Sequence, residues 1–102
     1  MPIPDVEIIN KLGAIMHVAL RIPEAEVIPD ARIFDDLGAE SIDILDIRFR
    51  IEEAFGFKID EGEIMRSIDP DKGFEELKDQ FTIGATAAFI RQKLDQLEQG
   101  HA

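Results

Sequence analysis

Apolar residues recur at helical spacing in three separate segments of the chain. The first segment covers residues 5–20, where Asp5 is placed to cap the start. The last covers residues 82–98, where Thr82 is placed as the cap before a tail that frays. The residues expected on these two apolar faces are Ile8, Leu12, Ile15, Met16 and Ala19 in the first segment, and Ile83, Ala87, Ile90, Leu94 and Leu97 in the last. Both patterns predict amphipathic helices.

The middle segment, residues 41–55, fits two interpretations. Leu45 to Glu52 alternate apolar and polar, as in a half-buried strand. We favour a helix, because Ser41 can serve as N-cap and Asp43 would lie in the first turn, where the helix dipole stabilises a carboxylate. A strand would also have no partner strand in the rest of the chain. The face expected at helical spacing is Ile44, Ile47, Ile51, Ala54 and Phe55.

Two long connections join these helices. Residues 21–40 contain two prolines and a glycine, and five apolar residues there are expected to point inward: Val27, Ile28, Ile33, Phe34 and Leu37. Residues 60–81 are broken by Gly62, Pro70 and Gly73, and Phe74, Leu77 and Phe81 could form a short amphipathic helix. The predicted fold is therefore all-α, a single domain over residues 1–102 in which three main helices and one or two short ones form a bundle.

The composition limits the classes of function. The chain of 102 residues is 45% apolar, which suffices for one modest core. It has no cysteine, which excludes disulfides and thiolate sites and is compatible with the cytoplasm. Neither a signal peptide nor a run of the roughly 18 apolar residues needed to span a membrane is found. We therefore expect a soluble cytoplasmic protein.

The net charge of -11 limits the kinds of partner that the protein is expected to bind. It disfavours nucleic acid and insertion into an anionic membrane, and it favours transient encounters with basic patches on other proteins. Self-repulsion predicts a monomer whose unmodified form loosens at low salt. The acidity could also serve solubility alone.

A second apolar strip remains on the middle helix after its core face is assigned. Ile42, Leu45 and Phe49 follow one another at spacings of three and four residues, and the acidic residues around them are Asp46, Glu52 and Glu53. An exposed apolar strip in an acidic frame is typical of a docking surface. The alternative is that residues 62–81 fold back and bury the strip.

Ser41 opens the helix that carries this strip. It could be no more than a helix cap. A helix N-terminus nevertheless presents unpaired amides and a positive dipole end, which suit a phosphodiester on the serine hydroxyl, and Gly38 gives the preceding turn its freedom.

The run Asp36-Leu37-Gly38-Ala39-Glu40-Ser41-Ile42-Asp43, with the helix ending Glu52-Glu53-Ala54-Phe55, resembles the modification site of acyl carrier proteins. The resemblance covers residues 5–60 and resumes near Thr82; Glu40 and Ile42 stand where the family usually has aspartate and leucine. It implies that a phosphopantetheinyl transferase moves a 4'-phosphopantetheine arm from coenzyme A to Ser41, and that the arm carries acyl groups as thioesters while the protein catalyses nothing. Acyl-chain synthases and acyltransferases with basic docking patches are the further partners implied. The residues that match the family's partner-binding positions are Asp36, Glu40, Ile42, Leu45, Asp46, Phe49, Glu52 and Glu53.

Two features depart from the family pattern. Arg48 and Arg50 place positive charge on a helix that is usually acidic, and the connection over residues 60–81 is longer than in compact members by roughly a dozen residues. The longer connection is similar to that of specialised carriers of very long acyl chains for lipid A. Its apolar residues could enlarge or cover a chamber between helices, or pack as an ordinary extra helix; they are Ile64, Met65, Ile68, Phe74, Leu77 and Phe81.

Other functions have weaker support. His17, expected near the core face of the first helix, and His101, in the tail, have no nucleophile or metal partner in view. Asp30, Asp35 and Asp36 lack the glycine and terminal glutamate of a helix-loop-helix calcium site. Two alternatives stay open: a non-covalent acidic helical interaction module that binds through the strip, and an aminoacyl or peptidyl carrier of a secondary-metabolite pathway. Modification of Ser41 distinguishes the first alternative from a carrier.

Overall fold

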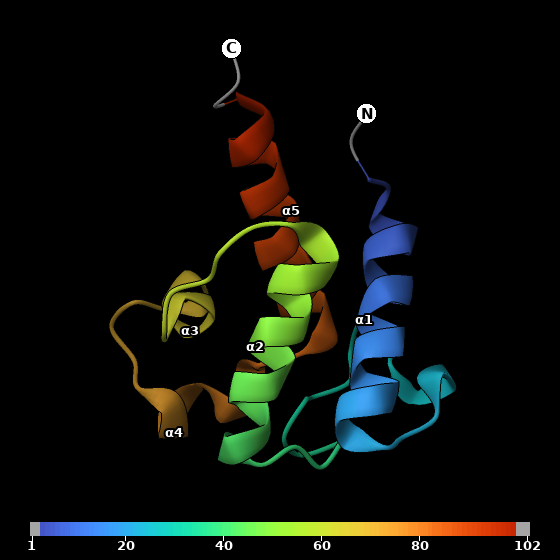
Figure 1. The fold of residues 1–102 in the computed structure, drawn as a ribbon. Coiled ribbons are helices and arrows are strands. Elements are labelled where there is room, and N and C mark those ends of the chain that lie inside the picture. The colour runs from blue at the N-terminus through green and yellow to red at the C-terminus, as the bar shows by residue number, and fades with distance from the viewer. Residues whose placement is uncertain (1–2, 100–102) are drawn as a thin grey trace.

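The computed structural model describes residues 3–99. Three long helices form a bundle, α1 (Asp5–Leu20), α2 (Ser41–Phe55) and α5 (Ile83–Gln99), and α1 packs against both of the others (Figure 1). The first two ranges are those predicted, and α5 begins and ends one residue later than the predicted range of 82–98. The predicted all-α bundle of three main and some short helices is confirmed.

The core is formed mainly by the predicted helix faces. Side chains with no exposed surface come from all three long helices and include Ile8, Leu12, Met16, Ile51, Ile83 and Ile90. Burying a side chain of this size contributes roughly 1.5–3 kcal/mol. Phe89 and Thr86 on α5 are also buried, and neither was expected.

Three positions predicted to face the core are exposed instead. Ala54 lies beside Ala14 and Val18 at a surface groove between α2 and α1. Leu97 lies on the last turns of α5, which extend beyond the end of α2 (Figure 1). Ile28 is exposed because its neighbours Val27 and Ala31 fill the inward positions of the first connection.

The helix ends correct two further predictions. Thr82 caps α5 as expected, since its Oγ1 accepts a hydrogen bond from the Ala85 N–H at 3.0 Å. Asp5, however, is not the cap of α1: Pro4 precedes the helix, and the Asp5 carboxylate accepts a hydrogen bond from Arg91 on α5. His17 is exposed rather than near the core, and its Nδ1 lies 2.7 Å from the Ile22 carbonyl oxygen just beyond the helix.

The first connection, residues 21–40, is attached to the start of α5. It contains one short 3-10 helix, η1 (Glu24–Glu26), and an isolated antiparallel bridge between Arg32 and Thr82. Around this bridge the Ile33 N–H donates to the Phe81 carbonyl and the Ile83 N–H donates to the Ala31 carbonyl, both at 2.9 Å. These bonds fix the segment that leads into α2.

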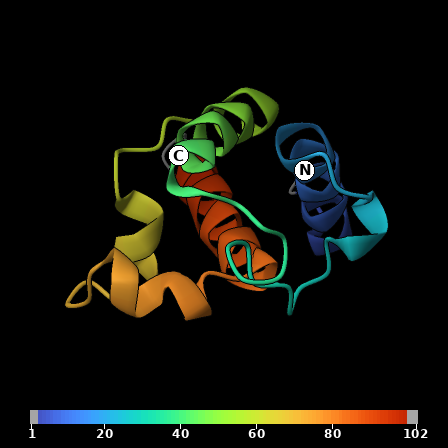
Figure 2. The same cartoon turned by 90° about the horizontal axis from the view of Figure 1, so that it is seen from below.

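The second connection lies on the side of α2 and α5 that faces away from α1 (Figure 2). It contains α3 (Glu63–Ile68), α4 (Phe74–Leu77) and the 3-10 helix η2 (Lys78–Gln80). An ion pair of 2.6 Å between Lys93 on α5 and Glu63 holds α3 in place, and the Phe74 ring packs edge-on against Phe34 at 5.0 Å between centroids. Within residues 3–99, no helix is both long and apolar enough to cross a bilayer.

Candidate functional site at the start of helix α2

The turn before α2 folds back on the first connection and leaves Ser41 on the surface. The N–H groups of Gly38 and Ala39 donate to the carbonyls of Phe34 and Ile33, both at 3.1 Å, and Ala39 is buried. Gly38 has φ of 76°, in the left-handed region that an L side chain rarely adopts, so glycine lets the chain reverse here. Ser41 follows this anchored turn and is exposed.

Ser41 is the first residue of α2 and not its N-cap, which corrects the expected geometry. Glu40 occupies the cap position, with an extended backbone at φ -107° and ψ 165°. Its N–H donates to Asp43 Oδ2 at 2.8 Å, so the carboxylate expected in the first turn completes the helix start. Because Glu40 and Asp43 form the cap, the Ser41 hydroxyl stands at the helix N-terminus without a capping role.

Asp36, one of the predicted partner-binding residues, is held by Arg32. The Asp36 carboxylate accepts hydrogen bonds from Arg32 Nε at 3.2 Å, Nη2 at 3.1 Å and the backbone N–H at 2.8 Å. The Arg32 side chain, followed by its backbone N–H, holds the pKa of Asp36 below its usual value. Sequence reasoning missed Arg32, because a spacing of four residues brings opposite charges together in a helix, and residues 21–40 were predicted to be a connection. No group of three or more potential metal ligands gathers anywhere in residues 3–99.

The apolar strip Ile42, Leu45 and Phe49 is exposed along α2, with exposed fractions of 76%, 53% and 52%. This overturns the alternative in which residues 62–81 fold back over it. Those residues cover the neighbouring face of α2 instead.

Several charged residues around the strip are paired with other groups of the protein. Asp46 forms an ion pair with Arg50 at 2.9 Å, and Glu52 accepts a hydrogen bond from the Ile59 N–H at 2.7 Å. The Arg48 guanidinium lies 5.3 Å from the centre of the Phe49 ring. Arg50 and Arg48, the two arginines that depart from the family pattern, therefore contact Asp46 and Phe49, which are both predicted to bind partners. The other two predicted acidic residues on or next to this helix, Glu40 and Glu53, are exposed.

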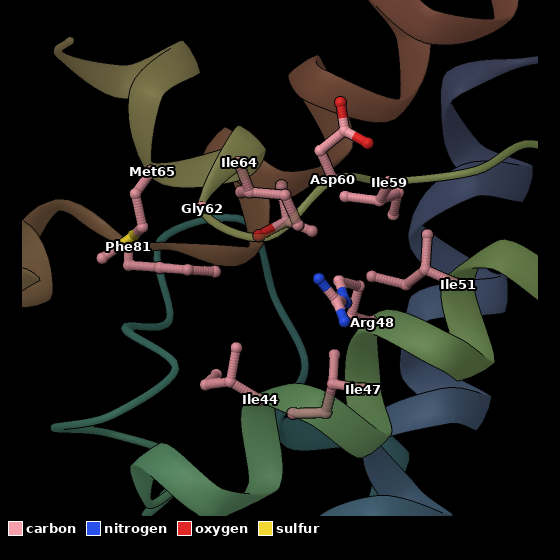
Figure 3. A pocket seen from close by; sticks show the side chains of 11 residues that line it. Ile44, Ile47, Arg48, Ile51, Ile59, Asp60, Gly62, Ile64, Met65 and Phe81 are labelled. Carbon is pink, nitrogen blue, oxygen red and sulfur yellow. The ribbon is translucent and has the colours of Figure 1, made fainter.

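The other face of α2 lines a pocket between α2, α3 and the start of α5 (Figure 3). Its volume is about 50 Å³, and its walls are mostly apolar, formed by Ile44, Ile47, Ile51, Ile59, Ile64, Met65 and Phe81. An engineered cavity of about 150 Å³ holds benzene, so this one accommodates only a few carbon atoms without widening.

The predicted chamber is thus present in part. Ile64, Met65 and Phe81 line the pocket as expected, whereas Ile68, Phe74 and Leu77 do not. Ile68 packs partly buried against the core, and Phe74 packs on Phe34. The connection builds one wall of the pocket through α3, and no residue of α4 lines it.

Arg48 is the cationic residue among the pocket-lining side chains. Its Nε is buried and has no hydrogen-bond partner within the described residues. An unsatisfied buried donor costs roughly 1–3 kcal/mol, and more when the group is charged. The sequence placed Arg48 on the docking helix but gave no sign that it reaches the pocket.

Comparisons with known proteins agree with this site. The profile of the family described as "Phosphopantetheine attachment site" matches residues 10–69, which include the anchored turn, Ser41 and α2. The chain is also similar to the acyl carrier protein of Thermotoga maritima, with 31% identity over 88 residues that cover 86% of this chain and 93% of the relative.

The chain belongs to the acyl carrier protein family. Its prosthetic group is accordingly 4'-phosphopantetheine, and its role is that of a covalent carrier and not of a catalyst. As a family member it interacts with a phosphopantetheinyl transferase and with enzymes that handle acyl groups.

Proposed function

We propose that Ser41 is the attachment point of the 4'-phosphopantetheine arm and that the protein carries acyl thioesters for fatty acid or specialised lipid biosynthesis. The observation that carries the proposal is the position of the Ser41 hydroxyl, exposed on the first residue of a 15-residue helix whose cap is supplied by other residues. The first amides of a helix and the positive end of its dipole stabilise a phosphodiester at this position. The residues present therefore fit the group.

The chain contains two serines, Ser41 and Ser67, and both lie within the range that matches the family profile. Ser67 differs in its environment, because its hydroxyl donates to the Ile64 carbonyl at 2.5 Å inside the short helix α3. This pair supplies a matched control for the assignment.

The test is the intact mass of the protein after incubation with coenzyme A and a broad-specificity phosphopantetheinyl transferase. We expect the wild-type protein and Ser67→Ala to gain the mass of one phosphopantetheine group, and Ser41→Ala to gain none. A mass gain that survives in Ser41→Ala would contradict the assignment. No gain in any of the three proteins, with active transferase, would favour the non-covalent interaction module.

We further propose that partner enzymes dock on the strip Ile42, Leu45 and Phe49. The exposure of these three side chains beside Ser41 supports this surface. The acidic residues around it are proposed to meet basic patches on the transferase, acyl-chain synthases and acyltransferases. Asp36, Glu40, Asp46, Glu52 and Glu53 complete the proposed surface, and the protein is proposed to act as a cytoplasmic monomer.

The identity of the acyl group is a more specific proposal than the carrier role. A very long acyl chain for lipid A stays a prediction that rests on the length of the connection over residues 60–81. The pocket of about 50 Å³ would hold only the first carbons of such a chain, with the rest outside or in a widened bundle. An aminoacyl or peptidyl cargo would use the same serine and arm.

A further inference from the structure

The pocket between α2 and α3 contains one polar feature that a hydrocarbon chain would not satisfy. The Arg48 guanidinium projects from α2 into the space between α2 and α3 (Figure 3), and its Nε has no hydrogen-bond partner within the described residues. A guanidinium has five N–H donors and no acceptor, so the group that completes this site must be an acceptor.

Arg48 also lies within the range of a group attached at Ser41. The two residues are seven positions apart on α2, which is about 10 Å along the axis at 1.5 Å per residue. Ile44 lies between them on the same face and lines the pocket. A flexible arm that begins at Ser41 and runs along this face therefore brings its acyl group to the pocket and to Arg48.

The remaining charges limit the kind of acceptor. Asp60 also lines the pocket, and its carboxylate points away from Arg48 (Figure 3). Asp60 therefore does not pair with the guanidinium, and the walls are otherwise mostly apolar, so a negatively charged acyl group would lose its hydration at a higher cost than a neutral hydroxyl or keto oxygen. The packing of the guanidinium near the Phe49 ring, at 5.3 Å, holds the donor at the edge of the pocket.

The Arg48 Nε atom is buried with almost no surface that a water molecule can reach, so the donor is unpaired among the described residues while the pocket keeps its present volume. An acyl group that enters must widen the pocket, and it then either supplies the missing hydrogen bond or leaves the donor unpaired. A saturated chain leaves it unpaired. A chain with an oxygen near the thioester replaces the bond, so the site distinguishes the two classes of acyl group.

We propose that Arg48 is a specificity-determining residue of the acyl pocket, whose Nε–H binds a neutral hydroxyl or keto oxygen on the first carbons of the acyl group. This inference rests on the proposed attachment at Ser41. It assigns a preferred cargo class, oxygenated acyl groups over saturated ones, independent of how far the chain continues beyond the pocket.

The test compares three forms of the protein, each verified by intact mass: the unacylated phosphopantetheine form, the butyryl form and the 3-hydroxybutyryl form, which differs from butyryl by one hydroxyl. The readout is the NMR signal of the Arg48 side-chain Nε–H, assigned by its absence in Arg48→Met. We expect this signal to shift, and its exchange with solvent to slow about tenfold or more, only in the 3-hydroxybutyryl form. The tenfold figure corresponds to one hydrogen bond from a charged donor.

A second readout is the rate at which hydroxylamine cleaves the thioester. Arg48→Met should accelerate cleavage of the 3-hydroxybutyryl form about tenfold and leave the butyryl form unchanged. Arg50→Met is the matched control, because Arg50 is two residues away on the same helix and pairs with Asp46 at the surface. It should change neither rate.

The outcomes separate this inference from the proposed function. If no form gains mass, the proposed attachment at Ser41 and the proposed role of Arg48 are both wrong. If loading succeeds but the Arg48 signal responds equally to butyryl and 3-hydroxybutyryl, only the role of Arg48 is wrong. A signal already shifted in the unacylated form would also overturn it, because the acceptor would then be the arm. The NMR comparison of wild-type forms keeps the test valid even if Arg48→Met folds poorly.

Discussion

Two faces of α2 carry similar apolar residues but have opposite environments. Ile51 on the pocket face has no exposed surface, whereas Ile42 on the strip is 76% exposed. The difference arises because α1 and the second connection cover the first face and leave the second open. Residue type alone therefore does not tell a core position from a docking position on this helix; the path of the connections decides it.

The largest expected effect is on stability, and it comes from a matched pair of substitutions. Ile51→Ala should lower the free energy of unfolding by about 2–5 kcal/mol, since it removes a fully buried side chain, while Ile42→Ala should change it by no more than about 0.5 kcal/mol. Chemical denaturation monitored by circular dichroism measures both. Equal losses in the two variants would mean that the strip is part of the core.

The next effect is on partner binding, and it should be confined to the strip. Phe49→Ala is expected to lower kcat/KM of the phosphopantetheinyl transferase for this protein about tenfold, the loss of an aromatic contact worth about 1–2 kcal/mol at an interface. The control is Val18→Ala, a side chain of similar exposure on α1. If both variants lose activity equally, or neither does, the proposed docking surface is wrong.

A smaller effect concerns the wall of the pocket. Burial alone would raise the pKa of Glu63, but the Lys93 ammonium and the Asp60 N–H together hold it below its ordinary value of 4.5. Because the folded-state pKa is lowered, this stabilisation is present above the unfolded value and is lost as the pH falls through the folded value.

Glu63→Gln should therefore cost roughly 1 kcal/mol at neutral pH, and the difference from wild type should shrink as the pH falls below 4.5 and through the lower folded-state pKa. Urea unfolding of both proteins at several pH values measures this. Glu53→Gln, at an exposed position, is the comparison and should change the free energy of unfolding by no more than about 0.5 kcal/mol. A difference that persists at acid pH would assign the effect to packing and not to the ion pair.

The smallest expected effect is on the melting temperature, and it comes from the net charge of the whole protein. With a net charge of -11, the unmodified protein should melt at a temperature roughly 2–4 °C higher in molar salt than at low ionic strength, about half a kcal/mol. Thermal denaturation in sodium chloride is the measurement. Melting temperatures that stay flat across salt concentration would show that self-repulsion does not limit stability.

Local patterns accounted for most of the helices and for the position of Ser41. The bounds of α1 and α2 followed from apolar spacing, and the cap at Thr82 followed from residue type. The cap of α2 was predicted wrongly, because residue type favours Ser41 as N-cap, whereas the extended backbone of Glu40 makes Glu40 the cap and Ser41 the first helical residue.

The pocket could not be derived from the sequence in the same way. Periodicity assigned Ile44, Ile47 and Ile51 to one face but named no partner for that face. The partners come from a segment with weak local pattern, and its position depends on contacts distant in sequence such as the ion pair between Lys93 and Glu63. Arg48 Nε is buried because this segment covers the pocket face of α2.

The sequence by itself determined the three long helices, the position of Ser41 at the start of α2 and the spacing of the apolar strip, because these depend on residue spacing within one helix. Only the tertiary structure decided which face of α2 is covered, that Arg32 and Thr82 form an antiparallel bridge between the first connection and the start of α5, and that Arg48 reaches into the pocket. The physical reason is that helical periodicity is set by neighbours three and four residues apart, whereas burial depends on where long connections bring distant residues together.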